Sequence, residues 1–289
     1  MDAGPVPPHL LTEIAAGIAA GRLIPYLGPE VLTLGAEPPP VPTGARELAH
    51  LLAGRVAVPG RIRNNLWHSA QYIETHRHRV TLDRLMAETF RPVPEPGPLH
   101  RWLAGLPRVP LMVDTWYDGA MAAAMAGRVD WGLVQGASKA RRVDDAPWFR
   151  AHAADGRECP AAEAGTWATV LYKPHGAAQP AGDVLVSDSD YVEVLSEIDI
   201  QTPIPAVVQD RRRERGFVFL GCRFYDQILR SFARAILKRS AGPHYAVVPA
   251  GELTRNETRF LAAENIIPLP VGLADAVVQL TGAAIGSSS

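Results

Sequence analysis

In the stretch Gly216-Phe217-Val218-Phe219-Leu220-Gly221, an apolar run without polar alternation ends abruptly at a glycine. The segment that follows, 226–239, carries apolar side chains on one helical stripe and basic side chains on the opposite one. Such a run is typical of a strand buried on both faces, and such a stripe is typical of a helix that packs on a sheet. This stretch therefore predicts a strand followed by a covering helix.

The same unit recurs along the chain. Five more short apolar runs end at Gly, Pro or Asp, and we expect strands at 23–27, 109–113, 168–172, 245–248 and 266–269. Segments 118–125 and 254–263 read as helices, the second with Thr254 and Glu257 as a capping box. Alternating strands and helices predict an α/β fold with a doubly wound, mainly parallel, Rossmann-like sheet, whose ligands bind beyond the carboxyl ends of the strands.

We expect one domain over residues 1–289 with two insertions on the ligand side of the sheet. The first, at about 38–104, is punctuated by proline and reads as helical, with helices near 45–52, 62–75 and 81–90. The second, at about 128–165, is polar and reads as irregular. Its Trp131 and Trp148 either anchor a protein partner or pack the insertion onto the domain.

Composition limits the classes of partner and compartment. Twenty-nine basic and thirty acidic residues give a net charge of −1, so no overall field attracts nucleic acid or an anionic membrane. The basic clusters at 139–142 and 211–215 lack interleaved aromatic residues, and we expect them to be solvated surface. The N-terminus does not resemble a secretory signal, and two cysteines form neither a disulfide scaffold nor a metal cluster. We therefore expect a cytoplasmic protein without a bound metal, with a homo-oligomer left open.

The residues that follow the predicted strands are the candidates for chemistry. Gly28 and Gly221 allow the backbone to approach a phosphate, although for Gly28 an ordinary tight turn is the favoured interpretation. His175, held between Pro174 and Gly176, suits a general base, although a turn histidine is often structural. Two further residues have simple alternatives: Asp118 as a helix cap, and Cys222 as a small packing residue instead of a reactive thiolate.

The order of these pieces resembles the sirtuin-like (silent-information-regulator-like) family of bacterial proteins. The resemblance rests on Leu23-Ile24-Pro25-Tyr26-Leu27-Gly28, Pro98-Leu99-His100-Arg101-Trp102-Leu103, Val170-Leu171-Tyr172-Lys173-Pro174-His175-Gly176, Ser187-Asp188-Ser189-Asp190-Tyr191, and Phe219-Leu220-Gly221 with Asp226. The family binds nicotinamide adenine dinucleotide (NAD) and breaks its nicotinamide–ribose bond. The resemblance implies His175 as the base, Asp118 as a second catalytic residue, and cofactor contacts at Gly28, Thr115, Trp116, Gly176, Gly221 and Cys222.

Two motifs depart from the family pattern. The family's first loop reads Gly-Ala-Gly-x-Ser, whereas this chain has Gly28-Pro29-Glu30-Val31-Leu32, which puts a carboxylate where a pyrophosphate belongs. The second motif reads Thr-Thr-Asn-Tyr-Asp, whereas this chain has Trp116 in place of the catalytic Asn, and an indole accepts no hydrogen bond. The zinc-binding cysteine pairs of the deacylase branch are missing from the sequence.

Two hypotheses follow, and the first is favoured. The chain is either a degenerate, non-catalytic sirtuin-like domain that binds a nucleotide (NAD or ADP-ribose) or a protein partner, or an active NAD hydrolase of the defence type. In the second case His175 is the base, and Asp114 or Asp118 positions water. A phosphate- or sugar-binding regulator on an unrelated doubly wound fold is the third possibility, because fold does not fix function.

Overall fold

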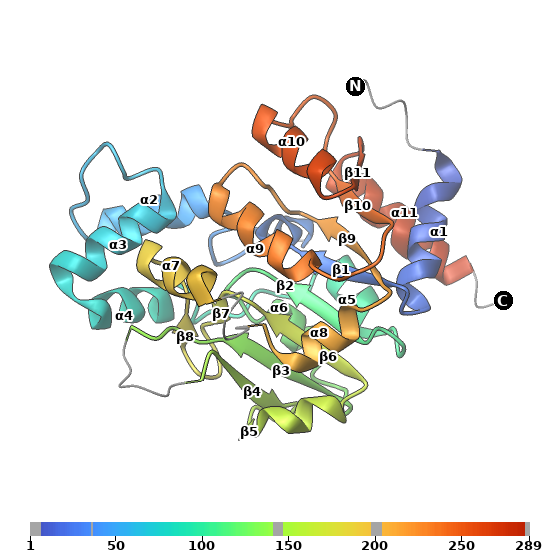
Figure 1. Cartoon of the computed structure of the whole chain (residues 1–289), viewed down its shortest axis with the longest axis horizontal. Helices are drawn as coiled ribbons and strands as arrows, with labels where there is room; N and C mark the ends of the chain where they lie inside the picture. The colour runs from blue at the N-terminus through green and yellow to red at the C-terminus, as the bar shows by residue number, and fades with distance from the viewer. Residues whose placement is uncertain (1–6, 36, 141–146, 198–203, 287–289) are drawn as a thin grey trace.

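A computed structural model describes residues 7–35, 37–140, 147–197 and 204–286. Its main sheet has the strand order β11-β10-β9-β1-β2-β6-β3-β4-β5 (Figure 1). The strands are parallel except for β4 and β5, which run antiparallel to their neighbours. Their bounds are β1 Leu23–Leu27, β2 Leu111–Asp114, β3 Trp131–Gly136, β4 Phe149–Ala153, β5 Glu158–Cys159, β6 Thr169–Lys173, β9 Gly216–Leu220, β10 His244–Val247 and β11 Ile266–Leu269.

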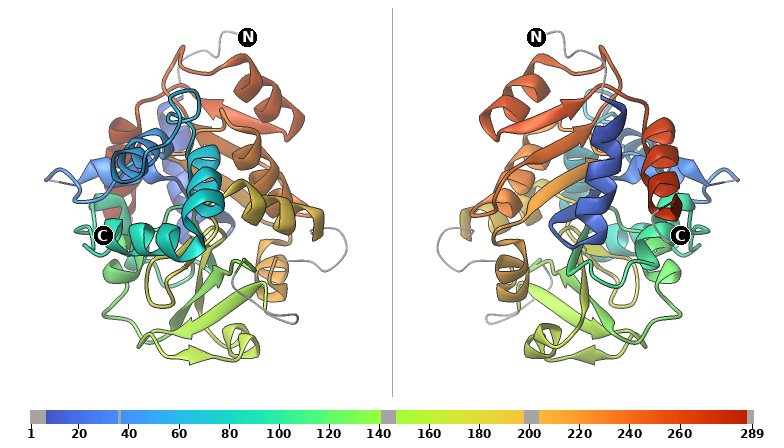
Figure 2. Two further views of the ribbon diagram at one scale, coloured as in Figure 1. Left: turned by 90° about the vertical axis from the view of Figure 1, so that its left-hand side faces the viewer. Right: turned by 90° about the vertical axis from the view of Figure 1, so that its right-hand side faces the viewer.

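Helices cover both faces of this sheet. Successive strand residues point to opposite sides, so each buried strand contributes side chains to two apolar clusters. Leu23 and Leu27 of β1 pack into one cluster with helices α1 (Pro8–Ala19), α5 (Pro98–Ala104), α6 (Ala120–Ala124) and α11 (Leu273–Gly286). Ile24 and Tyr26 pack into another with helices that include α8 (Ala206–Arg212), α9 (Gln227–Leu237) and α10 (Arg255–Ala263). Figure 2 shows α1 and α11 side by side on the first face.

The α/β fold with a mainly parallel sheet is confirmed, as are all six predicted strands, with shifts of one or two residues at some ends. The capping box of α10 is also confirmed: Thr254 accepts a hydrogen bond from the Glu257 N–H, and Glu257 reaches back to the Thr254 N–H. No helix in the described ranges combines the length and apolarity needed to cross a bilayer.

The prediction that 128–165 is irregular is wrong. This stretch contains β3, which lies between β6 and β4, followed by β4, β5 and the 3-10 helix η2 (Ala161–Gly165). Trp131 is in β3 and is only 5% exposed, and Trp148 is half-buried. The segment therefore extends the sheet, and Trp131 is a core residue and no partner anchor.

The expectation that 211–215 is solvated surface is also wrong for most of its arginines. Arg212 is buried and donates hydrogen bonds to the carbonyls of Ala235 and Ile236 at the end of α9. Arg211 donates to the carbonyls of Ala168 and Ala164, and Arg215 donates to the carbonyls of Gly21 and Arg211. These arginines therefore join α8 to the elements around it. In the other basic cluster, 141 and 142 lie outside the described residues, and Lys139 lies over the Trp148 ring at 3.8 Å from its centroid.

The expected helical insertion forms α2 (Ala45–Arg55), α3 (Leu66–Arg77) and α4 (Arg79–Thr89), which gather with α7 (Asp188–Glu197) at one end of the sheet (Figure 1). Buried Arg79 ties α4 to this end. Its guanidinium donates to both carboxylate oxygens of Asp190 at 2.8 Å, to Asp83 at 2.8 Å and to the carbonyl of Val184 at 2.6 Å. Val184 belongs to β8 (Asp183–Val184), which pairs with β7 (Gly176–Ala177).

We predict that Arg79→Ala lowers the free energy of unfolding by about 3–5 kcal/mol, because it leaves the buried Asp190 carboxylate without its cation. Arg84→Ala is the matched control. It removes an arginine of the same helix from an exposed pair with Glu88 at 2.9 Å, and we expect a loss of at most about 0.5 kcal/mol. Urea denaturation followed by circular dichroism measures both. Equal losses for the two variants would contradict the assignment.

Candidate functional site

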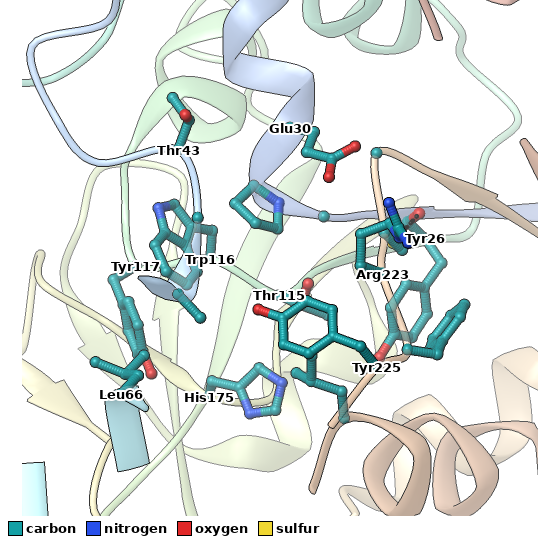
Figure 3. A pocket seen from close by; sticks show the side chains of 18 of the residues that line it. Tyr26, Glu30, Thr43, Leu66, Thr115, Trp116, Tyr117, His175, Arg223 and Tyr225 are labelled. Atoms are coloured by element: carbon teal, nitrogen blue, oxygen red, sulfur yellow. Dashed lines mark hydrogen bonds between the residues drawn. The ribbon is translucent and has the colours of Figure 1, made fainter. Parts of the chain in front are cut away.

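The candidate site lies where the strand order of the sheet reverses. The chain continues from β1 to β2 on one side, whereas β9, β10 and β11 extend the sheet on the other side of β1. Ligands of doubly wound sheets bind at such a point, beyond the carboxyl ends of the strands. One cavity lies here, and the predicted residues that line it are Gly28, Thr115, Trp116, His175, Gly221 and Cys222 (Figure 3).

The loops after β1 and β9 touch through their backbones. A side chain on Gly28 would overlap the carbonyl oxygen of Gly221, and Gly221 itself has a φ of +64°. A methyl group on Gly221 would meet the Val31 nitrogen at 2.8 Å. Both glycines are thus required by the contact between the two loops, whatever ligand the cavity holds.

This contact also engages the backbone donors of the first loop. The Gly28 N–H donates to the Leu220 carbonyl at 2.9 Å, and the Glu30 N–H donates to the Gly221 carbonyl at 3.3 Å. Pro29 has no N–H, and the Val31 N–H donates to the Gly28 carbonyl at 3.3 Å within the 3-10 helix η1 (Pro29–Leu34). Each residue from 28 to 31 therefore either lacks an N–H or already donates it to a carbonyl.

Trp116 forms part of the cavity wall. Its indole N–H donates to the Pro42 carbonyl at 2.7 Å, and its ring packs against both Phe90 and Tyr117. The preceding residue, Thr115, donates from its N–H and its hydroxyl to the Leu27 carbonyl, which fixes the loop after β2 against the end of β1. Figure 3 shows Trp116 and Tyr117 on one side of the cavity and Tyr26 and Arg223 on the other.

A buried ion pair joins the ends of β2 and β6. Lys173 Nζ lies 2.6 Å from Asp114 Oδ2, and both side chains are nearly inaccessible to solvent. Burial raises the pKa of Asp114 to about 6, although Lys173 opposes the shift. Asp114 also accepts a hydrogen bond from the Trp116 N–H at 3.1 Å. Its carboxylate is therefore committed to holding the strand ends, and Asp114 does not line the cavity.

His175 lines the cavity in a neutral state. Its ring is buried against Phe232, with 4.7 Å between ring centroids, and its Nδ1 lies 3.1 Å from the Tyr191 hydroxyl. Burial, together with the nearby charge of Lys173, lowers the pKa of His175 to about 3. At neutral pH the imidazole is uncharged, as a general base or a hydrogen-bond acceptor must be.

Three other predicted site residues are held by local structure. Asp118 accepts a hydrogen bond from the Ala120 N–H at 2.8 Å, as the alternative interpretation of this residue as a helix cap predicts. Asp118 does not line the cavity. Gly176 also lies outside the lining; its φ is +79°, and a side chain there would overlap the Asp183 carbonyl across the β7–β8 hairpin. Cys222 is buried, and burial raises the pKa of its thiol, as expected for a packing residue.

The mouth of the cavity carries charged groups and a tyrosine. The pKa of Glu30 is raised by burial, while Arg223 acts in the opposite direction. Arg223 itself pairs with Glu257 at 3.0 Å and with Glu252 at 3.2 Å, so its charge is already matched by two carboxylates. The Tyr225 side chain lines the cavity and is 44% exposed.

The cavity is small and largely aromatic, with a volume of about 70 Å³. Sequence patterns assigned no site role to several of its lining residues: Leu66, Trp67, Tyr191, Phe224 and Tyr225. Leu66 and Trp67 come from α3, where they look like ordinary apolar positions of a helix. Among the described residues no group of three or more His, Cys, Asp or Glu side chains is arranged to hold a metal ion.

Comparison with known proteins gives one family match. The family described as SIR2-like domain matches residues 110–269, which is more than half of the 289-residue chain. The matched span runs from β2 to β11 and includes His175 and Gly221. A search of the curated proteins finds no match.

We predict that Gly28→Ala destabilises the protein by about 1–3 kcal/mol, because the added methyl group has to displace the Gly221 carbonyl. Gly44→Ala is the matched control at the same cavity, since a methyl group there meets no atom within 4 Å and the expected change is within about 0.5 kcal/mol. Thermal and urea unfolding measure the difference. An unchanged free energy of unfolding in Gly28→Ala would show that the two loops separate easily.

We also predict that acid destabilises the protein through His175. Its folded-state pKa of about 3 is below the ordinary 6.5, so the unfolded chain takes up the proton first. The contribution of neutral His175 to the free energy of unfolding is fully present above pH 6.5 and is lost as the pH falls toward 3. His175→Gln should reduce the slope of unfolding free energy between pH 6 and 5 by about 1.4 kcal/mol per pH unit. His100→Gln should act in the same direction, because burial lowers the pKa of His100 to about 4. An unchanged slope in His175→Gln would contradict this account.

Proposed function

The chain belongs to the SIR2-like domain family, and we propose that it is a non-catalytic member that acts by binding, with a protein partner favoured over a nucleotide. One observation carries this proposal. The first loop, which would have to lie against the pyrophosphate of NAD, donates its available N–H groups to the chain's own carbonyls. A diphosphate at this position would meet carbonyl and carboxylate oxygens in place of donors.

Electrostatics at the mouth supports the same conclusion. Glu30 lies at the cavity in the first loop, and its field disfavours a doubly charged pyrophosphate. Arg223 is the cation available beside it among the lining residues, and Glu252 and Glu257 already neutralise its charge. A dinucleotide would therefore have to compete with two carboxylates for this guanidinium.

The space in the cavity supports the proposal as well. Pockets that hold small molecules measure about 300–1,000 Å³, whereas this cavity measures about 70 Å³. Trp116 and Tyr225 occupy part of its lining, and the Trp116 indole is fixed by its hydrogen bond to Pro42. A dinucleotide would enter only if the wall moved, whereas a single side chain of a partner needs far less room.

Tyr225 is the residue best placed to contact a partner. Tyrosines at the centre of an interface contribute strongly to binding, and Tyr225 is half-exposed beside an aromatic cavity. This site replaces Trp131 and Trp148 as the proposed anchor. We expect the protein to act as one domain and in a reducing cytoplasm, which fits the two free cysteines, Cys159 and Cys222.

A specific observation favours a second candidate, an active NAD hydrolase. His175 is neutral and lines the cavity, and the sequence resemblance implies that it is the base. In that reaction His175 would accept a proton from a ribose hydroxyl while the nicotinamide–ribose bond breaks and water attacks. Asp114 and Asp118 are not free to position that water, because Lys173 and the start of α6 engage their carboxylates.

Incubation of the purified protein with NAD, followed by chromatography of released nicotinamide, tests the proposal. We expect no release above the buffer blank. Turnover that disappears in His175→Ala would overturn the non-catalytic assignment and establish the hydrolase. Turnover that persists in His175→Ala would indicate a contaminating enzyme, and a preparation purified further should then lose it.

Calorimetry and thermal shift with ADP-ribose separate a nucleotide-binding domain from a protein-interaction module. We expect neither heat nor a shift in melting temperature at millimolar ADP-ribose, because the first loop has no free donors to offer. Saturable heat would replace the protein-partner proposal with nucleotide binding. Glu30→Gln serves as the matched variant: stronger binding in this variant would assign the obstacle to the carboxylate.

A further inference from the structure

Two tyrosine hydroxyls meet at a single backbone carbonyl behind His175. Tyr117 donates to the Leu185 carbonyl at 2.8 Å, and Tyr191 lies 2.9 Å from the same oxygen. The Tyr191 hydroxyl is also 3.1 Å from His175 Nδ1. All of these side chains are buried, so water does not compete for the contacts.

The positions of the protons follow from this geometry. A carbonyl oxygen can only accept, and it has two lone pairs, so it can receive both tyrosine protons. If Tyr191 turned its proton to His175 instead, its oxygen would lie 2.9 Å from a carbonyl oxygen with no proton between them. Two buried acceptors at that distance repel each other. The Tyr191 proton is therefore on the Leu185 side, and its lone pair faces Nδ1.

We propose that Tyr191 is a positioning residue that fixes the tautomer of His175, with the proton on Nδ1 and a bare lone pair on Nε2. Nδ1 donates to the Tyr191 oxygen. The described part of the chain offers no partner to Nε2, and the ring lines the cavity. Nε2 of His175 is then a hydrogen-bond acceptor in the lining of the cavity.

This inference goes beyond the proposed function, because it concerns the free protein and holds whether or not a nucleotide is cleaved. It also limits what the cavity accepts. A guest has to bring a hydrogen-bond donor, such as a hydroxyl or an amide N–H, to Nε2. Carboxylate or phosphate oxygens would place two acceptors against each other, and the neutral ring does not compensate their charge.

The tautomer is read directly from long-range proton–nitrogen correlation spectra of the histidine rings at pH 7, in which protonated and bare ring nitrogens have separate signatures. His175→Gln identifies the signals of His175. Two variants then test the role of Tyr191. Tyr191→Phe removes the hydroxyl that contacts His175, whereas Tyr117→Phe removes the other hydroxyl on Leu185 and leaves the contact to His175 in place.

We expect His175 to carry its proton on Nδ1 in the wild type and in Tyr117→Phe, and to lose this signature, wholly or in part, in Tyr191→Phe. A wild-type ring protonated on Nε2 would overturn the inference by itself, even if a variant failed to fold. The same tautomer in all three folded proteins, checked by their melting transitions, would also overturn it. The outcome of the NAD assay has no bearing on either result.

Discussion

The contact between Gly28 and Gly221 is the constraint on which the site depends. It brings the loops after β1 and β9 into backbone contact at the point where the sheet reverses its strand order. A third loop joins them, because Thr115 donates twice to the carbonyl of Leu27. Three strand ends are thus connected by main-chain groups, and the space left beneath them is lined by aromatic side chains from α3, α7 and the loop before α9. The shape of the cavity follows from this closure more than from any single side chain.

Buried pairs of charged side chains stabilise the same end of the sheet, one pair between two strands and one between two helices. Lys173 and Asp114 connect β6 to β2, and Arg79 connects α4 to Asp190 at the start of α7. Burying such groups is costly, and the cost is offset by the opposite charge of each partner and by backbone hydrogen bonds to Arg79, Asp114 and Asp190. These pairs therefore hold His175, which follows Lys173 by two residues, and Tyr191, which follows Asp190, in a fixed relation to each other.

Six of the parallel strands could be predicted from the sequence because each is a clean apolar run, but β3, which is parallel to β6, was missed. That strand contains Gly132, where the ring of Trp167 leaves no room for a side chain, and the buried Gln135, so it lacks the appearance of a core strand. Most residues that line the cavity directly follow predicted strands. Leu66 and Trp67 were missed because only the tertiary fold brings α3 to the site. The partners of Arg211 and Arg212 were equally hidden, because backbone carbonyls leave no trace in a sequence.

The two edges of the sheet have a consequence for self-association. In β11, the Leu269 carbonyl accepts from Val248 on the β10 side, so the alternate residue Pro268 faces outward. Proline has no N–H, and an incoming strand would find a donor missing in the middle of a four-residue edge. The opposite edge, β5, is only two residues long. Growth of the sheet by strand addition is therefore blocked at both borders, which protects the folded protein against fibrous aggregation and leaves its helical faces as the surfaces through which copies could assemble.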